Sequence, residues 1–135
     1  SRNSRWCLND NYLMFWFRFI FPNLSMIELG KNNMLEQFIL KNYEQYSGRI
    51  LERYFSDMIA ESEDITDIGN YWDNKGENEI DIIALNRFEN KALIAEVKRN
   101  FHKVNIACLY EKVATIKKQL AQYTLDIKGL SMQDM

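Results

Sequence analysis

Apolar residues in the middle of the chain alternate with polar ones in two neighbouring segments, 79–85 and 92–98. A period of two is typical of β-strands, because successive side chains of a strand point to opposite faces of the sheet. The short segment 87–90 between them predicts a turn, so we expect a hairpin. Its simplest register pairs Leu85 with Ala92, and every pair farther from the turn follows from this one.

Acidic residues interrupt these otherwise apolar strands. The same register places Ile83 opposite Ile94 and Asp81 opposite Glu96, with Lys98 on the face of Glu96. Directly opposed residues have Cβ atoms roughly 4.5–5.5 Å apart, and two carboxylates at that distance repel each other unless a cation or a proton intervenes. We therefore expect Asp81 and Glu96 to share a divalent metal ion, with Lys98 beside it.

The amino-terminal part of the chain is strongly aromatic. Asn9 or Asp10 can cap a helix over 11–21, and Pro22 is expected to end it, because the residue before a proline is pushed out of helical geometry. Nearly every side of this helix is apolar, so it either packs in the core or offers a surface to a partner, including a second copy of the chain. It contains Arg18 and is too short for the roughly 20 residues of a membrane span, so no membrane segment is expected.

Two more helices are predicted before the strands. Asn32 or Asn33 can start the first, and Gly48 is expected to separate it from a second helix over about 47–62. Glu52 lies at the edge of an apolar stripe on that second helix, either as a solvated flank or as part of a site on the neighbouring sheet. The stripe consists of Leu51, Tyr54, Phe55, Met58 and Ile59.

The remaining elements complete an α/β (α+β) pattern. Segment 65–72 is expected to form a first strand, segment 105–119 a helix, and segment 123–127 a last strand. The order is then helix, three strands, helix, strand. This order predicts a core domain over 47–135, preceded by an aromatic helical extension over 1–46.

Charge limits where nucleic acid can bind. Lys and Arg number 17 against 19 Asp and Glu, so the formal net charge is -2 and any polyanion site must be local. A basic group follows the hairpin and either contacts a nucleic-acid backbone or forms a solvated face. It consists of Arg99, His102, Lys103 and Lys112.

Cysteine usage and the chain start indicate the setting. Cys7 and Cys108 lack CxxC spacing, so we expect unpaired thiols and a cytoplasmic protein. No secretory signal pattern is found. The chain begins at Ser1 without a methionine, which suggests a fragment of a longer protein.

The acidic positions resemble those of the PD-(D/E)XK nuclease superfamily. Glu52 stands where that superfamily has an acid on the first core helix, Asp81 stands for the strand aspartate, and 96–98 (Glu-Val-Lys) stands for the (D/E)XK element. Ile80 occupies the position where a proline often precedes the aspartate. The resemblance implies a restriction-endonuclease-like core.

The resemblance also implies a chemistry. Mg²⁺ or Mn²⁺ would be held by Asp81, Glu96 and the backbone carbonyl of Val97, with Glu52 acting through water. Lys98 would orient the attacking water or stabilise charge on the phosphate. The expected enzyme is a Mg²⁺-dependent endonuclease or phosphodiesterase, in which Glu52, Asp81, Glu96 and Lys98 are the catalytic residues.

Most of the chain resembles the DUF234 family, the carboxyl-terminal domain of archaeal and bacterial AAA-type ATPases. The matching stretches are 8–13, 15–19, 69–72, 79–82, 95–98 and 129–131. The resemblance implies an amino-terminal ATPase module outside this chain. The chain has no Gly-Lys-Ser/Thr phosphate-binding loop, so it is not expected to bind ATP itself.

Two functions compete at this stage. The first is a metal-dependent nuclease-like domain that acts on DNA as part of a larger AAA-type ATPase. The second is a non-catalytic module that binds nucleic acid or protein, in which the helix over 11–21 docks on the ATPase or on another copy. A purely structural domain would leave Asp81 and Glu96 without a reason to face each other.

Overall fold

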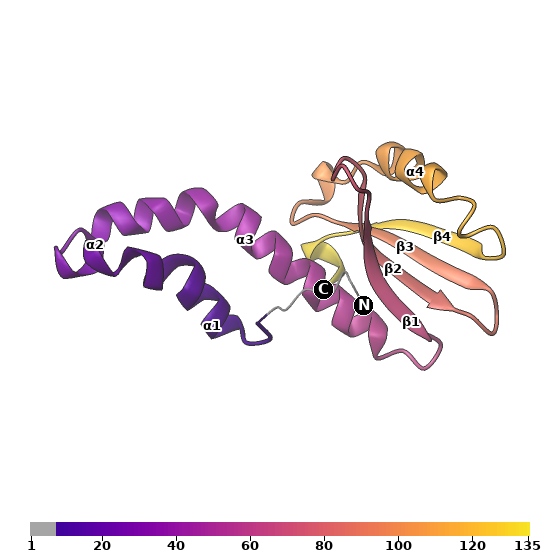
Figure 1. Ribbon diagram of the computed structural model, residues 1–135, viewed down its shortest axis with the longest axis horizontal. Coiled ribbons are helices and arrows are strands. Elements are labelled where there is room, and N and C mark those ends of the chain that lie inside the picture. Colours follow the sequence, from indigo (N-terminus) through magenta and orange to yellow (C-terminus); the bar gives the residue numbers. More distant parts are fainter. Residues whose placement is uncertain (1–7) are drawn as a thin grey trace. The chain divides into compact units, whose positions relative to one another are not determined.

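The computed structural model describes residues 8–135 (Figure 1). The chain divides into two compact units, with the division between Tyr46 and Ser47. The division falls inside the long helix α3 (Asn32–Ala60). Cys7 lies outside the described residues, and Cys108 is a free, half-buried thiol.

The first unit begins with the predicted aromatic helix. The carboxylate of Asp10 caps α1 (Asn11–Phe15) by accepting a hydrogen bond of 2.9 Å from the Leu13 N–H. The chain continues as a π-helix (Trp16–Ile20) and a 3₁₀ helix (Phe21–Asn23), and α2 (Leu24–Glu28) follows directly. The prediction that Pro22 ends the helical path was wrong, because Pro22 lies in the first turn of the 3₁₀ helix, where a missing N–H and a fixed φ are tolerated.

Aromatic rings form the core of the first unit. Phe19 is fully buried, and its ring centroid lies 5.1 Å from that of Phe15, 5.2 Å from that of Tyr46 and 6.2 Å from that of Phe38. The helix over 11–20 therefore packs partly inside its own unit. Other apolar side chains of this unit remain exposed, among them Tyr12, Leu13, Phe17, Phe21, Leu24, Ile27 and Leu29.

α3 is one continuous helix of 29 residues, so the prediction of two helices separated at Gly48 was wrong. A glycine inside a helix costs only about 1 kcal/mol relative to alanine, and a long helix that is packed on both sides of the glycine tolerates that cost. Within residues 8–135, no helix is long and apolar enough to cross a membrane.

The second unit contains a four-stranded mixed sheet in the order β1-β2-β3-β4. β1 (Asp67–Trp72), β2 (Glu79–Asn86) and β3 (Lys91–Val97) are antiparallel neighbours, and β4 (Thr124–Leu130) pairs in parallel with β3. α4 (Ile106–Thr115) connects β3 to β4. The α+β class and the predicted element order are thus confirmed.

Apolar clusters cover both faces of the sheet. The face toward α3 is packed by Leu51, Phe55, Ile82, Ala95, Val97 and Leu130. The face toward α4 is packed by Ile80, Ile94, Leu109, Val113, Ile116 and Leu120. The sheet is therefore buried between the carboxyl-terminal part of α3 and α4.

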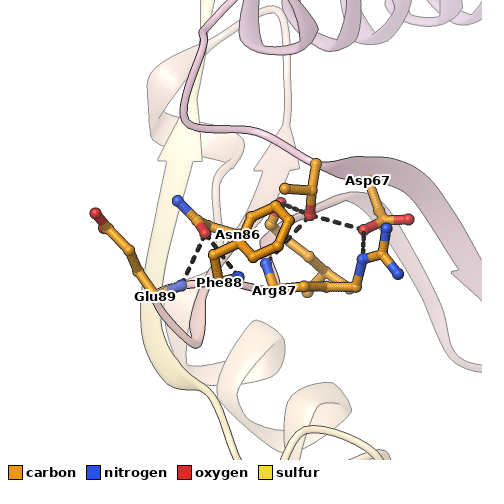
Figure 2. Close-up of polar contacts among 7 residues, drawn as sticks. Asp67, Asn86, Arg87, Phe88 and Glu89 are labelled. Atoms are coloured by element: carbon orange, nitrogen blue, oxygen red, sulfur yellow. Dashed lines mark hydrogen bonds and ion pairs between the residues drawn. The ribbon is translucent and has the colours of Figure 1, made fainter.

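The turn between β2 and β3 is held by Asn86, whose side chain points into it (Figure 2). Its Oδ1 accepts hydrogen bonds from the backbone N–H groups of Phe88 at 3.0 Å and Glu89 at 2.9 Å. Arg87 forms an ion pair with Asp67 on β1, with 2.7 Å between Nε and Oδ2. This turn closes the hairpin end that is remote from Asp81.

Candidate active site

The β2–β3 ladder has the predicted register near the turn. Leu85 pairs with Ala92, and the ladder continues to its last pair, Ile82 with Ala95. The pair predicted next, Asp81 with Glu96, does not follow in the ladder. The prediction of direct opposition was therefore wrong.

A β-bulge in β2 explains the difference. In the ladder with β1, Gly69 pairs with Ile83 and Tyr71 pairs with Ile80. Between these two pairs β1 advances by two residues, whereas β2 advances by three. β2 therefore carries one extra residue at this point, which is the definition of a bulge. As a result Ile80 packs toward α4 and Ile82 packs toward α3, although they are two positions apart.

Asp81 lies within this bulge and is redirected by it. Its Oδ2 accepts a hydrogen bond of 2.7 Å from the backbone N–H of Val97. A side-chain oxygen thus takes the place of a backbone acceptor where β2 and β3 separate. The backbone N–H of Val97 thus contacts Asp81. The role of the Val97 carbonyl as a metal ligand stays a prediction.

Glu52 on α3 is electrostatically coupled to the bulge. Burial, followed by the charges of Asp81 and Glu79, raises the pKa of Glu52 from 4.5 to about 7, although Lys98 and Arg49 oppose the shift. At neutral pH the folded protein thus holds this carboxyl close to half protonated.

The pKa of Asp81 is raised as well. Burial is the main cause, and the charges of Glu96 and Glu79 add to it, whereas the Val97 N–H and Lys98 act in the opposite direction. Glu52, Glu79, Asp81 and Lys98 thus form one interacting group, called here the acidic group. Perturbed carboxyl groups of this kind are common at functional sites.

Glu96 is directed toward α4. It is only 7% exposed, and its Oε2 accepts a hydrogen bond of 3.1 Å from the N–H of Asn105, the residue that caps α4. Its Oε1 lies 3.7 Å from Nζ of Lys112. A carboxylate at a helix N-terminus is favourable, so Glu96 holds the start of α4 in place.

The predicted basic residues separate into two sets. Lys98 is exposed directly after β3, and Arg99, His102 and Lys103 follow it within five positions. Lys112 is partly buried and is occupied by Glu96. Within the first set, the charge of Lys98 acts on Glu52 and Asp81.

Two of the predicted metal ligands, Asp81 and Glu52, are suited to bind a cation. Among residues 8–135, no three Asp, Glu, His or Cys side chains converge enough to enclose a metal ion. Mg²⁺ does not need such an enclosure, because it commonly binds one or two carboxylates and keeps several waters. Asp81 and Glu52, whose mutual repulsion a cation would relieve, suit this mode, whereas Glu96 would first have to leave Asn105 and Lys112.

Two residues that were not assigned a role from the sequence, Glu79 and Asn105, contribute to the site. Glu79 contributes to the pKa shifts of both Glu52 and Asp81. Its position two residues before Asp81 was the available sign. Asn105 was detectable as an N-cap residue, because its side chain accepts a hydrogen bond of 3.0 Å from the Cys108 N–H.

Comparison with known proteins gives a family. Residues 16–109 match DUF234, described as archaeal and bacterial proteins of unknown function, and this range contains Glu52, Asp81, Glu96 and Lys98. The chain is also 40% identical over 105 residues to the uncharacterized protein MJECL04 of Methanocaldococcus jannaschii. That alignment covers 73% of this chain and 23% of the relative, so the chain spans less than a quarter of the relative's length. No solved structure matches the chain.

Proposed function

We propose that this chain, which belongs to the DUF234 family, is a nuclease-like domain of the PD-(D/E)XK type that hydrolyses phosphodiester bonds in DNA with Mg²⁺ or Mn²⁺. The observation that carries the proposal is the position of Asp81, which is held in the bulge by the Val97 N–H and interacts there with Glu52 of α3 and with Lys98. Two partly desolvated acids, Glu52 and Asp81, with the charge of Glu79 acting on both, are costly to a fold and useful to a cation site.

Asp81 is the principal cation ligand in this proposal. The Val97 N–H fixes its Oδ2, which leaves Oδ1 to face the ion. Glu52 completes the donor set, directly or through a water. The ion would supply Lewis-acid stabilisation of the charge that develops on the phosphate.

The other groups have separable roles. Lys98, an ammonium beside the acidic group, stabilises negative charge on the phosphate. Glu52 would hold the attacking water beside the cation as a hydrogen-bond acceptor, because a bound cation would favour its ionised form. Glu96 acts as a positioning residue, since it ties the start of α4 to the strand that leads into Lys98.

The partners follow from the resemblance stated above. We place an AAA-type ATPase module in the longer family members, of which this chain would be the carboxyl-terminal part. A second candidate function, a protein-interaction module, is favoured by one observation. The first unit leaves large apolar side chains exposed, among them Tyr12 and Phe21 at 73% and 57%.

Cleavage of labelled DNA at low salt tests the proposal. Purified protein with Mg²⁺ or Mn²⁺ is expected to cut single-stranded or duplex DNA, and Asp81→Asn and Lys98→Ala to remove the cutting. Lys98→Ala should keep its Mn²⁺ affinity, because the lysine serves the phosphate, whereas Asp81→Asn should lose it. Asp126→Asn, at an exposed position on β4, is the matched control. Wild-type protein that cut no better than Asp81→Asn would leave the interaction module as the better account.

A further inference from the structure

The connection between β3 and α4 combines positive charge with an exposed aromatic ring. Residues 98–105, called here the β3–α4 loop, contain Lys98, Arg99, His102 and Lys103. No acidic residue occurs anywhere from 97 to 110, in a chain whose net charge is -2. A local field of this kind attracts a polyanion although the whole chain does not.

Phe101 is the most exposed apolar side chain of this loop. Its surface is 50% exposed, and its ring lies 6.1 Å from that of His102, at an angle of 70°. Burying a phenylalanine side chain favours folding, and this loop leaves about half of that surface in water. An aromatic face left open among basic residues is the arrangement that binds unpaired bases in single-stranded nucleic acid.

Hydrogen bonds hold the loop in one shape. The side-chain Oδ1 of Asn100 accepts a hydrogen bond of 3.0 Å from the backbone N–H of His102. The backbone carbonyl of Asn100 accepts a hydrogen bond of 2.9 Å from the N–H of Lys103. Val104 packs so closely on Gly129 of β4 that a Cβ at that glycine would collide with it. The ring is therefore presented on a preorganised support, which reduces the entropy lost on binding.

The loop begins at the acidic group and ends at Glu96. Lys98 begins the loop and belongs to the acidic group. Asn105 ends the loop and donates its N–H to Glu96, which fixes the other end of the loop at the start of α4. A strand bound along the loop would therefore reach Lys98, at the edge of the acidic group.

We propose that the β3–α4 loop binds single-stranded nucleic acid, with one base stacked on Phe101 and the adjoining phosphates held by Arg99, His102 and Lys103. The inference rests on the proposed function and names its substrate class. Bases inside a duplex are already stacked on both faces, so a protruding ring discriminates in favour of unpaired nucleotides.

Binding without cleavage tests this directly. Fluorescence anisotropy in EDTA at low salt would measure the affinity of the protein for oligo(dT), oligo(U) and a blunt duplex. Phe101→Leu keeps an apolar side chain but removes the ring, and should weaken single-strand binding by about five- to a hundred-fold, with duplex binding unchanged. Phe101→Trp should retain the binding. Phe88→Leu, at a ring 88% exposed in the β2–β3 turn, is the matched control and should change nothing.

The outcomes separate this inference from the proposed function. If Phe101→Leu bound single strands as tightly as the wild type, or lost single-strand and duplex affinity equally, the stacking role would be overturned, even if Asp81-dependent cleavage were found. If the Phe101 effect were found and Mn²⁺ supported no cleavage, the stacking role would stand and the nuclease proposal would fail.

Discussion

Glu52→Gln tests the acidic group through protein stability, without reference to any substrate. Glu52 has a pKa of about 7 in the folded protein against 4.5 ordinarily. Between these values the folded state binds more protons than the unfolded state, so stability falls as pH rises. The contribution of Glu52 to the free energy of unfolding is fully present below about pH 4.5 and is lost as the pH rises through about 7. Glutamine fills nearly the same space and cannot ionise, so the variant should not show this loss.

The expected magnitude follows from the size of the shift. At about 1.4 kcal/mol per pH unit, a change from 4.5 to about 7 corresponds to at most about 3 kcal/mol. Glu52 is only half-buried, so screening by solvent reduces the expected value to about 2 kcal/mol. For a chain of this size that corresponds to a difference in Tm of roughly 5–10 °C at pH 8.

Thermal unfolding of wild type, Glu52→Gln and Glu36→Gln at pH 5, 6, 7 and 8 provides the assay. Glu36 is exposed on the same helix and serves as the control. Glu52→Gln should gain on the wild type from pH 5 to about pH 7 and the difference should level off toward pH 8, where Mn²⁺ should recover part of the wild-type deficit. If the wild-type and Glu52→Gln curves stayed parallel over this range, Glu52 would not be held among the other acids.

Three further predictions concern the fold and the support of the site. Gly48→Ala should stabilise the protein by about 0.5–1 kcal/mol in urea unfolding, since nothing lies within 4 Å of the added Cβ; a loss of stability would mean that α3 is interrupted there. Glu96→Gln should cost about 1–3 kcal/mol with or without Mg²⁺, because Lys112 loses its partner; a cost seen only with Mg²⁺ would make Glu96 a metal ligand instead. Phe19→Ala should cost about 3–5 kcal/mol in the same assay, because it empties the aromatic core of the first unit; a cost below 1 kcal/mol would show that this core is not packed.

The hairpin could be predicted from the sequence because its turn is short and its strands are apolar. A shift of one residue would move Leu85 and Ile83 to the face opposite Ala92 and Ile94, and the short turn over 87–90 selects the register that the structure has. α4 was detectable for a similar reason, because its apolar residues keep a three-four spacing.

The bulge at Asp81 could not be predicted. Ile80 and Ile82 flank the aspartate, and the sheet is packed on both faces, so an apolar residue is acceptable on either side. A slip of one residue therefore leaves no trace in the alternation of polar and apolar positions. The same slip separates Asp81 from Glu96 and allows Glu96 to hold α4. Gly48 was misjudged for a different reason, since packing along α3 outweighs the helix propensity of one residue.

Anomalous scattering from crystals grown at pH 7.5 and soaked in Mn²⁺ tests the central claim most directly. The account predicts one anomalous peak at the acidic group, about 2.1 Å from an oxygen of Asp81, with Glu52 as the second acid. The peak should disappear in Asp81→Asn crystals and persist in Lys98→Ala crystals. Absence of the peak in the wild type, or a peak that survives Asp81→Asn, would contradict the assignment of this group as a cation site.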